Sequence, residues 1–245
     1  KELEAELLGD PLDEIALSEE QPNTVNSLKE CDLALEWLQL GHEQRLQGLR
    51  VFCEHRDARS LPLLVPLLQE PCPVERMSAV YALGRNPCPR AVPILLKLLG
   101  TDDNAYVRKA SAWSLGNYFD APVLKPLINA LQTDVAAVRL WAASSLAEVG
   151  LGSSKNAELA SRQLLVSLRI DNEPVVRSNC IWSLGRLHEK LAIQLRDDVE
   201  EAFLTVLLKD KEASVRYEAR IALEQLENPI INARVKRLVE KGLIA

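Results

Sequence analysis

Cysteine is the first side chain whose chemistry must be weighed in this sequence, because thiolates bind metals and act as nucleophiles. Cys72 and Cys88 each stand between two prolines and mark opposite ends of one expected helix. About 16 residues of helical rise would separate them by ~24 Å, too far to share a metal ion. No CxxC or Cys/His spacing indicates a cluster. We therefore expect no cofactor and no metal, and keep Cys72 and Cys88 as candidate thiolate ligands at a partner interface.

Arginine recurs at a spacing that organises the chain. Each anchor arginine is followed by a small residue three positions on and usually by a leucine seven positions on. The six anchors, separated by 31, 32, 31, 38 and 39 residues, are Arg45, Arg76, Arg108, Arg139, Arg177 and Arg216. Such a period is typical of helix pairs that stack on one another. It predicts an all-α fold, an α-solenoid of about six stacked helix pairs, in which the second helix of each pair starts near the arginine.

Aspartates that precede the arginines indicate a structural role for them. Asp103 and Asp134 stand five residues before Arg108 and Arg139, in the turn that leads into the second helix. A guanidinium can donate bidentate hydrogen bonds to a carboxylate and further hydrogen bonds to main-chain carbonyls of a turn. We expect these pairs to form ladders that link one repeat to the next, and not to form a functional site.

The distribution of charge suggests the domain organisation. Residues 1–20 hold one lysine and eight acids, a net charge of −7, whereas the whole chain carries −6. Residues 1–25 are thus an acidic segment, either a solvated tail or a short helix that docks through its leucines on a partner or on its own solenoid. Residues 26–245 form a single solenoid domain with a capping helix from about residue 229. The two long spacings predict an extended loop at 150–155 and extra helix with its turn at 188–198.

Composition excludes several function classes. The repeat body carries a charge near +1 and has no stripe of Lys and Arg, which argues against nucleic-acid binding. No apolar run approaches the ~20 residues that cross a bilayer, and the chain does not open like a secretion signal. Five cysteines at irregular spacing fit a reducing compartment. No phosphate loop, Ser/His/Asp set or pair of acids on one face indicates an enzyme.

The register of the second helices predicts their exposed face. With the anchor arginine as position zero and 100° per residue, positions zero, three, four, seven and eight are packed, and positions two, five and nine lie opposite. We expect this opposite side to be the concave surface of the stack and to bind a protein partner. Its candidate residues are Tyr81, Arg85, Trp113, Asn117, Trp141, Glu148, Trp182 and Arg186. Aromatic area beside polar anchors is the composition of an interface hot spot, although an aromatic at position five could instead fill the gap between neighbouring second helices.

The repeat also resembles a known family. Residues 107–116 read VRKASAWSLG and are echoed by VRLWAASSL at 138–146 and VRSNCIWSLG at 176–185. This pattern resembles the HEAT repeats of the phycobilin-lyase-like superfamily, from about residue 30 to the end. Residues 71–143 are most similar to its cyanobacterial and plastid branch, which partners an A-type iron–sulfur carrier. The resemblance implies a cyanobacterial cytoplasmic or plastid stromal location.

Some HEAT-repeat proteins are di-iron enzymes, and this sequence lacks their metal-binding pattern. The difference argues against a di-iron site in this chain. Deoxyhypusine hydroxylases of this repeat type hold their metals on His-Glu pairs at corresponding places. Here His42-Glu43 precedes a second helix, His188-Glu189 follows one, and two further pairs are missing.

Two functions remain open. The favoured one is a noncatalytic adaptor or scaffold whose concave aromatic surface holds a protein partner, an A-type iron–sulfur carrier if the resemblance extends so far. The alternative is a phycobilin lyase subunit or a chaperone of bilins or phycobiliproteins, in which the same aromatic rings would stack against a tetrapyrrole.

Overall fold

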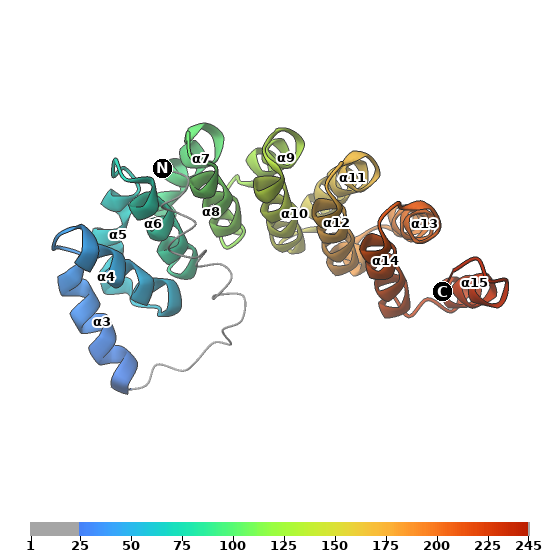
Figure 1. Ribbon diagram of the computed structural model, residues 1–245, viewed down its shortest axis with the longest axis horizontal. Helices are drawn as coiled ribbons and strands as arrows, with labels where there is room; N and C mark the ends of the chain where they lie inside the picture. Colours follow the sequence, from blue (N-terminus) through green and yellow to red (C-terminus); the bar gives the residue numbers. More distant parts are fainter. Residues whose placement is uncertain (1–24, 245) are drawn as a thin grey trace. The chain divides into compact units, whose positions relative to one another are not determined.

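The computed structural model describes residues 25–244, and over this range the chain consists of helices joined by short turns, without a β-strand (Figure 1). The acidic segment expected at residues 1–25 lies outside the described residues except for its last member. No helix between residues 25 and 244 combines the length and apolar character needed to cross a membrane. The chain divides into two compact units, Lys1–Pro126 and Leu127–Ala245, which we describe separately.

The first unit contains three helix pairs, each made of neighbouring antiparallel helices. The pairs are α3 (Val25–Trp37) with α4 (His42–Glu54), α5 (Leu61–Leu67) with α6 (Pro73–Arg85), and α7 (Val92–Thr101) with α8 (Ala105–Leu115). Single 3₁₀ turns, η1 (Ala58–Ser60) and η2 (Pro89–Ala91), lead into α5 and α7. The second helices α4, α6 and α8 pack side by side in that order, so α6 has a second helix on either side.

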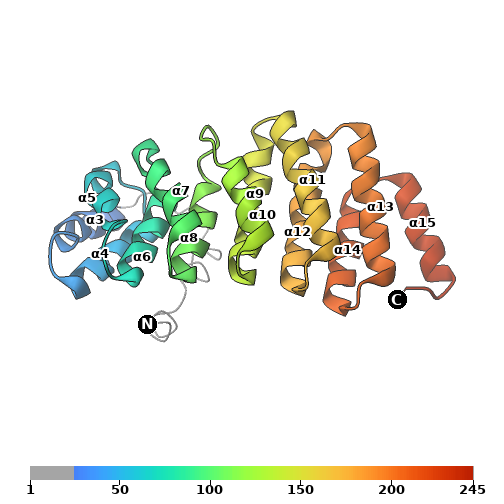
Figure 2. The same ribbon diagram turned by 90° about the horizontal axis from the view of Figure 1, so that it is seen from above.

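The second unit repeats this arrangement with longer helices (Figure 2). Its pairs are α9 (Leu124–Thr133), whose first turn contains the division between the units, with α10 (Ala136–Leu151), α11 (Ser154–Ile170) with α12 (Pro174–Leu187), and α13 (Ile193–Lys209) with α14 (Ala213–Gln225). A 3₁₀ turn, η3 (His188–Lys190), follows α12, and α15 (Pro229–Glu240) follows α14. The described residues therefore contain the six helix pairs that the period predicts.

The anchor arginines mark the starts of the second helices. In all six pairs the second helix begins three residues before its arginine, for example at Pro73 before Arg76 and at Ala105 before Arg108. Among the second helices, α8 has a side-chain cap: the Asn104 Oδ1 atom accepts hydrogen bonds from the main-chain N–H groups of Tyr106 and Val107, at 2.9 and 3.3 Å. The periodicity of the anchor arginines therefore predicts where each second helix begins.

The other repeated residues form the core. Position seven holds Phe52 or a leucine in every pair, and all six side chains are fully buried. Position three is small because the first helix of the pair lies close to it. At Gly48, a β-carbon would approach the main-chain oxygen of Ala34 in α3 to 2.9 Å. These two positions face the partner helix within each pair, so the repeated pattern records packing.

The long spacings are accommodated differently from expectation. The predicted extended loop at residues 150–155 is wrong, because α10 continues to Leu151 and α11 begins at Ser154. Ser153 caps α11 by accepting the N–H of Asn156 at 3.2 Å. The residues from 188 to 198 form η3, a short turn and the start of α13. The additional residues of the two long repeats therefore lie mainly in the helices α10, α11 and α13, which are 16, 17 and 17 residues long.

The last helix is fastened to the first helix of the preceding pair. Asn228 caps α15 through its Oδ1 atom, and its Nδ2 atom donates to both carboxylate oxygens of Glu200 in α13, at 3.1 Å. The buried Glu200 also lies 3.1 Å from the Nε2 atom of His188. Helix α15 begins at Pro229, where a capping helix was expected. It exposes Ile230 as well as its basic residues, and its role as a cap stays a prediction.

Candidate functional site

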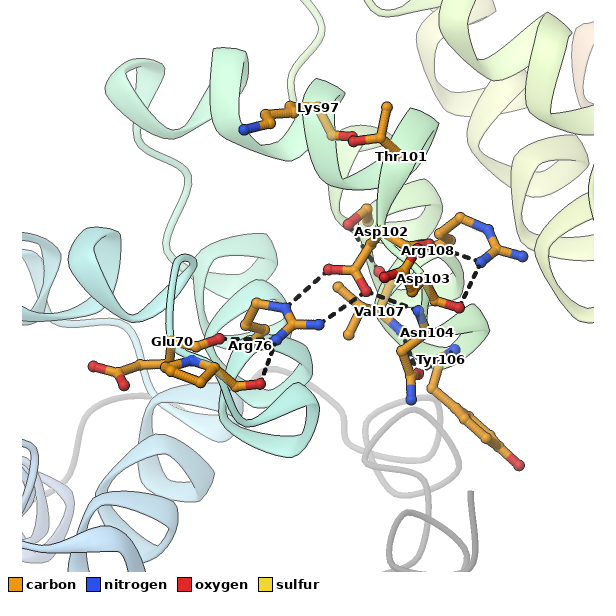
Figure 3. Close-up of polar contacts among 12 residues, drawn as sticks. Glu70, Arg76, Lys97, Thr101, Asp102, Asp103, Asn104, Tyr106, Val107 and Arg108 are labelled. Atoms are coloured by element: carbon orange, nitrogen blue, oxygen red, sulfur yellow. Dashed lines mark hydrogen bonds and ion pairs between the residues drawn. The ribbon is translucent and has the colours of Figure 1, made fainter. Parts of the chain in front are cut away.

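The guanidinium of Arg76 links two consecutive repeats of the first unit (Figure 3). Its Nε and Nη2 atoms donate to the two carboxylate oxygens of Asp102 at 2.9 and 3.0 Å, and its Nη1 atom donates to the carbonyl of Glu70 at 2.8 Å. The carbonyl of Asp102 in turn accepts a hydrogen bond from Arg108 at 2.8 Å. One aspartate therefore joins the arginine of its own repeat to the arginine of the preceding repeat.

The same bridge recurs twice in the second unit. Arg139 binds the carboxylate of Asp171 at 2.7 and 2.8 Å, and Arg177 binds that of Asp210 at 2.8 and 2.7 Å. Each aspartate stands six residues before the next arginine, whereas the expected Asp103 and Asp134 stand five residues before theirs. Asp103 and Asp134 offer their main-chain carbonyls to Arg108 and Arg139. In these three repeats the guanidinium satisfies carboxylate and carbonyl oxygens of the turns, as a structural role requires.

Electrostatics within the ladder favour the charged forms. Burial alone would raise the pKa of the Asp210 carboxyl. The hydrogen bonds from Arg177 and from the main-chain N–H of Glu212 outweigh burial and hold this pKa below its usual value. The same balance, with Arg139 and the N–H of Glu173, lowers the pKa of Asp171. Each guanidinium therefore faces a carboxylate, and not a neutral acid, at neutral pH.

In the first unit the structure corrects the expected exposure of the aromatic residues. Tyr81 is fully buried in α6, so it presents no surface to a partner. Trp113 is half-buried, and its ring meets the Tyr81 ring edge-on, with the centroids 5.6 Å apart and the planes at 66°. The indole also lies against Gly84, where an added β-carbon would come within 2.2 Å of it. Both aromatics therefore pack between α6 and α8.

The polar candidates of the first unit lie beside this packed pair. Arg85 is half-buried and its Nε atom donates to the carbonyl of Cys53 in the neighbouring repeat, at 3.3 Å. Asn117 is half-buried just beyond the end of α8, and its main-chain N–H donates to the carbonyl of Ser114. A partner-binding role for Arg85, Trp113 and Asn117 stays a prediction.

In the second unit three predicted residues come together. Trp182 in α12 is 46% exposed, and the guanidinium carbon of Arg186, one turn further along the same helix, lies 5.0 Å from the centroid of its ring. A carboxylate oxygen of Glu148 in α10 lies 3.1 Å from Arg186 and holds it from the other side. The pair is thus an exposed indole with a positioned cation over it, an arrangement stabilised by ~0.5–1 kcal/mol at such sites.

Further residues extend this patch, and sequence reasoning missed some of them. Trp141 is half-buried on α10, two turns before Glu148 on the same helix face. Val175 and Tyr217, which are 55% and 62% exposed, lie on the outward sides of α12 and α14 by register. We call Trp141, Glu148, Val175, Trp182, Arg186 and Tyr217 together the second-unit face. Val175 is at position minus two and Tyr217 at position one. At 100° per residue both positions lie on the same side of the helix as position five, so including them would have identified both residues.

An asparagine fixes the frame of the second-unit face. The Nδ2 atom of Asn179 donates to the carbonyl of Leu140 and to the hydroxyl of Ser144, both at 2.6 Å, and so ties α12 to α10. Position two was expected to be free for a partner. Asn179 instead holds two second helices in register, which positions Trp182 relative to Glu148.

The cysteines give little support for metal chemistry. Cys88 is buried, contrary to the exposure expected of a thiolate ligand, and its main-chain N–H donates to the hydroxyl of Tyr118 at 3.2 Å. Cys72 is half-buried at the start of α6. Burial raises the pKa of the Cys53 thiol to about 12. Within residues 25–244, no three His, Cys, Asp or Glu side chains converge as a metal site.

Comparison with known proteins identifies the family to which the repeats belong. The family model described as HEAT repeats matches residues 42–116 and 104–185. No curated protein matches the chain significantly.

Solved structures carry the same fold. A chain of the complex of CpcE and CpcF of phycocyanin lyase from Nostoc sp. PCC7120 is 26% identical over 68% of this chain and 99% of that one, with a TM-score of 0.56. A designed armadillo repeat protein in complex with the peptide (KR)4 is 20% identical over 87% and 97% of the two chains, with a TM-score of 0.55. Kap121p is 15% identical over 91% of this chain and 28% of its own length, with a TM-score of 0.61. The last two likenesses concern the fold alone.

Proposed function

This chain belongs to the HEAT-repeat family, and from that premise we propose that it is a noncatalytic adaptor whose second-unit face binds a protein partner. The observation that carries the proposal is the exposed ring of Trp182, with Arg186 stacked on it and Glu148 fixing Arg186. Exposed tryptophan and arginine are enriched in the few residues that dominate binding energy at interfaces.

The rigidity of this patch supports an interface more than a solvated surface. Arg186 lies between a ring and a carboxylate, and Asn179 ties the two helices together, so little conformational freedom remains to be lost on binding. A preorganised surface keeps more of its contact energy as affinity. Its mixed character, two tryptophans with one cation and one anion, fits a protein surface with both apolar and polar groups.

For the partner itself we propose an A-type iron–sulfur carrier, in a cyanobacterial cytoplasm or a plastid stroma. The support is the similarity of residues 71–143 to the branch of the superfamily that partners such carriers. Under this proposal the cluster is cargo of the partner and the adaptor contributes no ligand to it.

The likeness to a chain of phycocyanin lyase favours a second candidate. This chain would then be a lyase subunit or a chaperone for a bilin or a phycobiliprotein, with Trp141 and Trp182 offering faces to a tetrapyrrole. Bilin attachment needs an acid or base near the pigment, and Glu148 is the acid that the second-unit face provides. Because Glu148 is engaged by Arg186, the adaptor remains the better-supported function.

Binding to purified candidates tests both functions. We expect the carrier to bind the wild-type protein and to bind Trp182→Ala at least ~30-fold more weakly, which corresponds to the ~2 kcal/mol of an interface hot spot. Ile170→Ala is a matched control, because Ile170 is 71% exposed on the neighbouring helix α11. Equal affinity of wild type and Trp182→Ala would contradict the proposed face.

The bilin alternative has its own readout. A purified bilin mixed with the protein should change its absorbance spectrum if the second-unit face holds the pigment, and Trp182→Ala should remove the change. A bilin spectrum that stays the same with the wild-type protein would contradict the lyase or chaperone function.

A further inference from the structure

The guanidinium of Arg186 is oriented by the fold but only partly used by it. Its carbon atom lies 5.0 Å from the centroid of the Trp182 ring, and its Nη2 atom donates to Glu148 at 3.2 Å. Among residues 25–244, no group accepts a hydrogen bond from its Nε or Nη1 atom. Arg186 therefore holds N–H groups in a fixed direction for an acceptor that the described chain does not supply.

Arg177, on the same helix α12, shows a guanidinium that the fold uses completely. Its Nε and Nη2 atoms donate to Asp210, and its Nη1 atom donates to the carbonyls of Asp171 and Asn172 at 3.0 and 3.1 Å. The Arg177 side chain is 6% exposed, whereas that of Arg186 is 41% exposed. Solvent and a binding partner can thus reach the unused N–H groups of Arg186.

The neighbouring helices balance the charge of Arg186 on one side only. Helices α10, α12 and α14 pack side by side in that order within the second unit (Figure 2). Position nine holds Glu148 in α10, Arg186 in α12 and Gln225 in α14, so register places an acid on one side and a neutral amide on the other. Glu224, the acid beside Gln225, accepts a hydrogen bond from Arg220 at 3.0 Å. The α14 side of Arg186 is therefore the side where a further anion fits.

Apolar side chains lie near the open side of the guanidinium. Trp182 is 46% exposed, and Ile221, at position five of α14, is half-buried. A planar guanidinium with unused N–H groups binds a carboxylate in a defined geometry, and apolar neighbours strengthen the bond by excluding water. The nearby acids Glu189 and Glu218 form no ion pair with Arg186, but their charges oppose a phosphate dianion more than a single carboxylate.

From these observations we infer that the partner carries an Asp or Glu whose carboxylate accepts the unused N–H groups of Arg186, next to an apolar side chain that packs on Trp182 and Ile221. Arg186 then selects partners by charge, and Glu148 is a positioning residue that holds the guanidinium in place. This inference rests on the proposed function, since it concerns the partner of the second-unit face.

Peptide selection tests the chemistry of the partner. Random peptides displayed on phage are selected on the full chain, and those that also bind Trp182→Ala are discarded, so the peptides that remain require the second-unit face. We expect an Asp or Glu next to an apolar residue to be enriched severalfold over the starting library. Remaining peptides without this enrichment would overturn the inference and leave the proposed function standing. If no peptide remains, both are overturned.

Paired substitutions test the contact itself. Calorimetry compares a selected peptide with its acid-to-amide variant on the wild type and on Arg186→Gln. Loss of the peptide acid should weaken binding to the wild type at least ~10-fold and binding to Arg186→Gln less than ~twofold, as for a charge-assisted hydrogen bond. If Arg186 only supports Trp182, both chains will show the same loss, and that result would overturn the inference. Arg162→Gln is the matched control, because Arg162 is an exposed arginine paired with Glu158 on α11, and it should keep the preference for the acid.

Discussion

A β-carbon added to Gly84 would lie 2.2 Å from the Cζ3 atom of Trp113, so the indole of α8 rests directly on the backbone of α6. The anchor register puts Trp113 at position five and Gly84 at position eight of the preceding repeat. The glycine is thus required by its neighbour's side chain and not by its own backbone conformation. At the corresponding place before Trp182, position eight of α10 is Ala147, which carries a β-carbon where Gly84 has none.

Gly84→Ala should therefore destabilise the protein. The methyl group cannot be accommodated without moving the indole, and overpacking of this kind costs ~1–3 kcal/mol. Gly185→Ala is the matched control, because Gly185 occupies position eight of α12 and a β-carbon there meets no atom within 4 Å. That change should be neutral or stabilising by ~0.5–1 kcal/mol, as for glycine in a helix. Urea unfolding of both variants measures the difference, and equal stability would contradict the contact.

Replacing each of the two tryptophans with alanine should distinguish a residue that stabilises the fold from one that lies on the surface. Trp113→Ala removes a half-buried ring that contacts Tyr81 and Gly84, and should cost ~2–4 kcal/mol of unfolding free energy. Trp182→Ala removes an exposed ring and its contact with Arg186, and should cost under ~1 kcal/mol. Thermal unfolding gives both values. Similar losses for the two variants would show that Trp182 also has a packing role.

The fold could be predicted from the sequence because each repeated residue has a local cause. The anchor arginine follows the helix start by three residues in every pair, and the small residue at position three is dictated by the first helix beside it. The prediction of an extended loop at 150–155 is wrong, because a long spacing between anchor arginines does not distinguish a longer loop from longer helices. Helix α10 instead continues through Gly150, whose missing β-carbon leaves room for Leu187.

The candidate site was less predictable, for a physical reason. Register identifies which side of a helix faces away from its pair, but it does not say what lies on that side. Tyr81 and Trp182 occupy the same position, and one is buried while the other is exposed. The cation over Trp182 was within reach of the sequence, since Arg186 follows four residues later on the same helix.

Loss of one ladder carboxylate should be costly. The side chains of Arg177 and Asp210 are 6% and 8% exposed and 2.7 Å apart, so Asp210→Asn leaves a guanidinium buried without its counter-charge. Breaking a buried pair in this way costs ~3–5 kcal/mol. Glu158→Gln is the control, because Glu158 pairs with Arg162 on the surface of α11 and such pairs contribute ~0.5 kcal/mol or less. Chemical denaturation should show at least a severalfold difference between the two losses.

The ladder also predicts how stability depends on pH. The pKa values of Asp171 and Asp210 lie below their usual values in the folded chain, because the hydrogen bonds to the carboxylates outweigh burial. A lowered folded pKa stabilises the protein above the unfolded value of ~3.9, and this stability is lost as pH falls through the folded pKa. The urea midpoint should fall steeply below about pH 4. In Asp210→Asn the fall should be shallower, because one linked carboxylate is gone, and a fall as steep as in the wild type would exclude Asp210 as a source of the pH dependence.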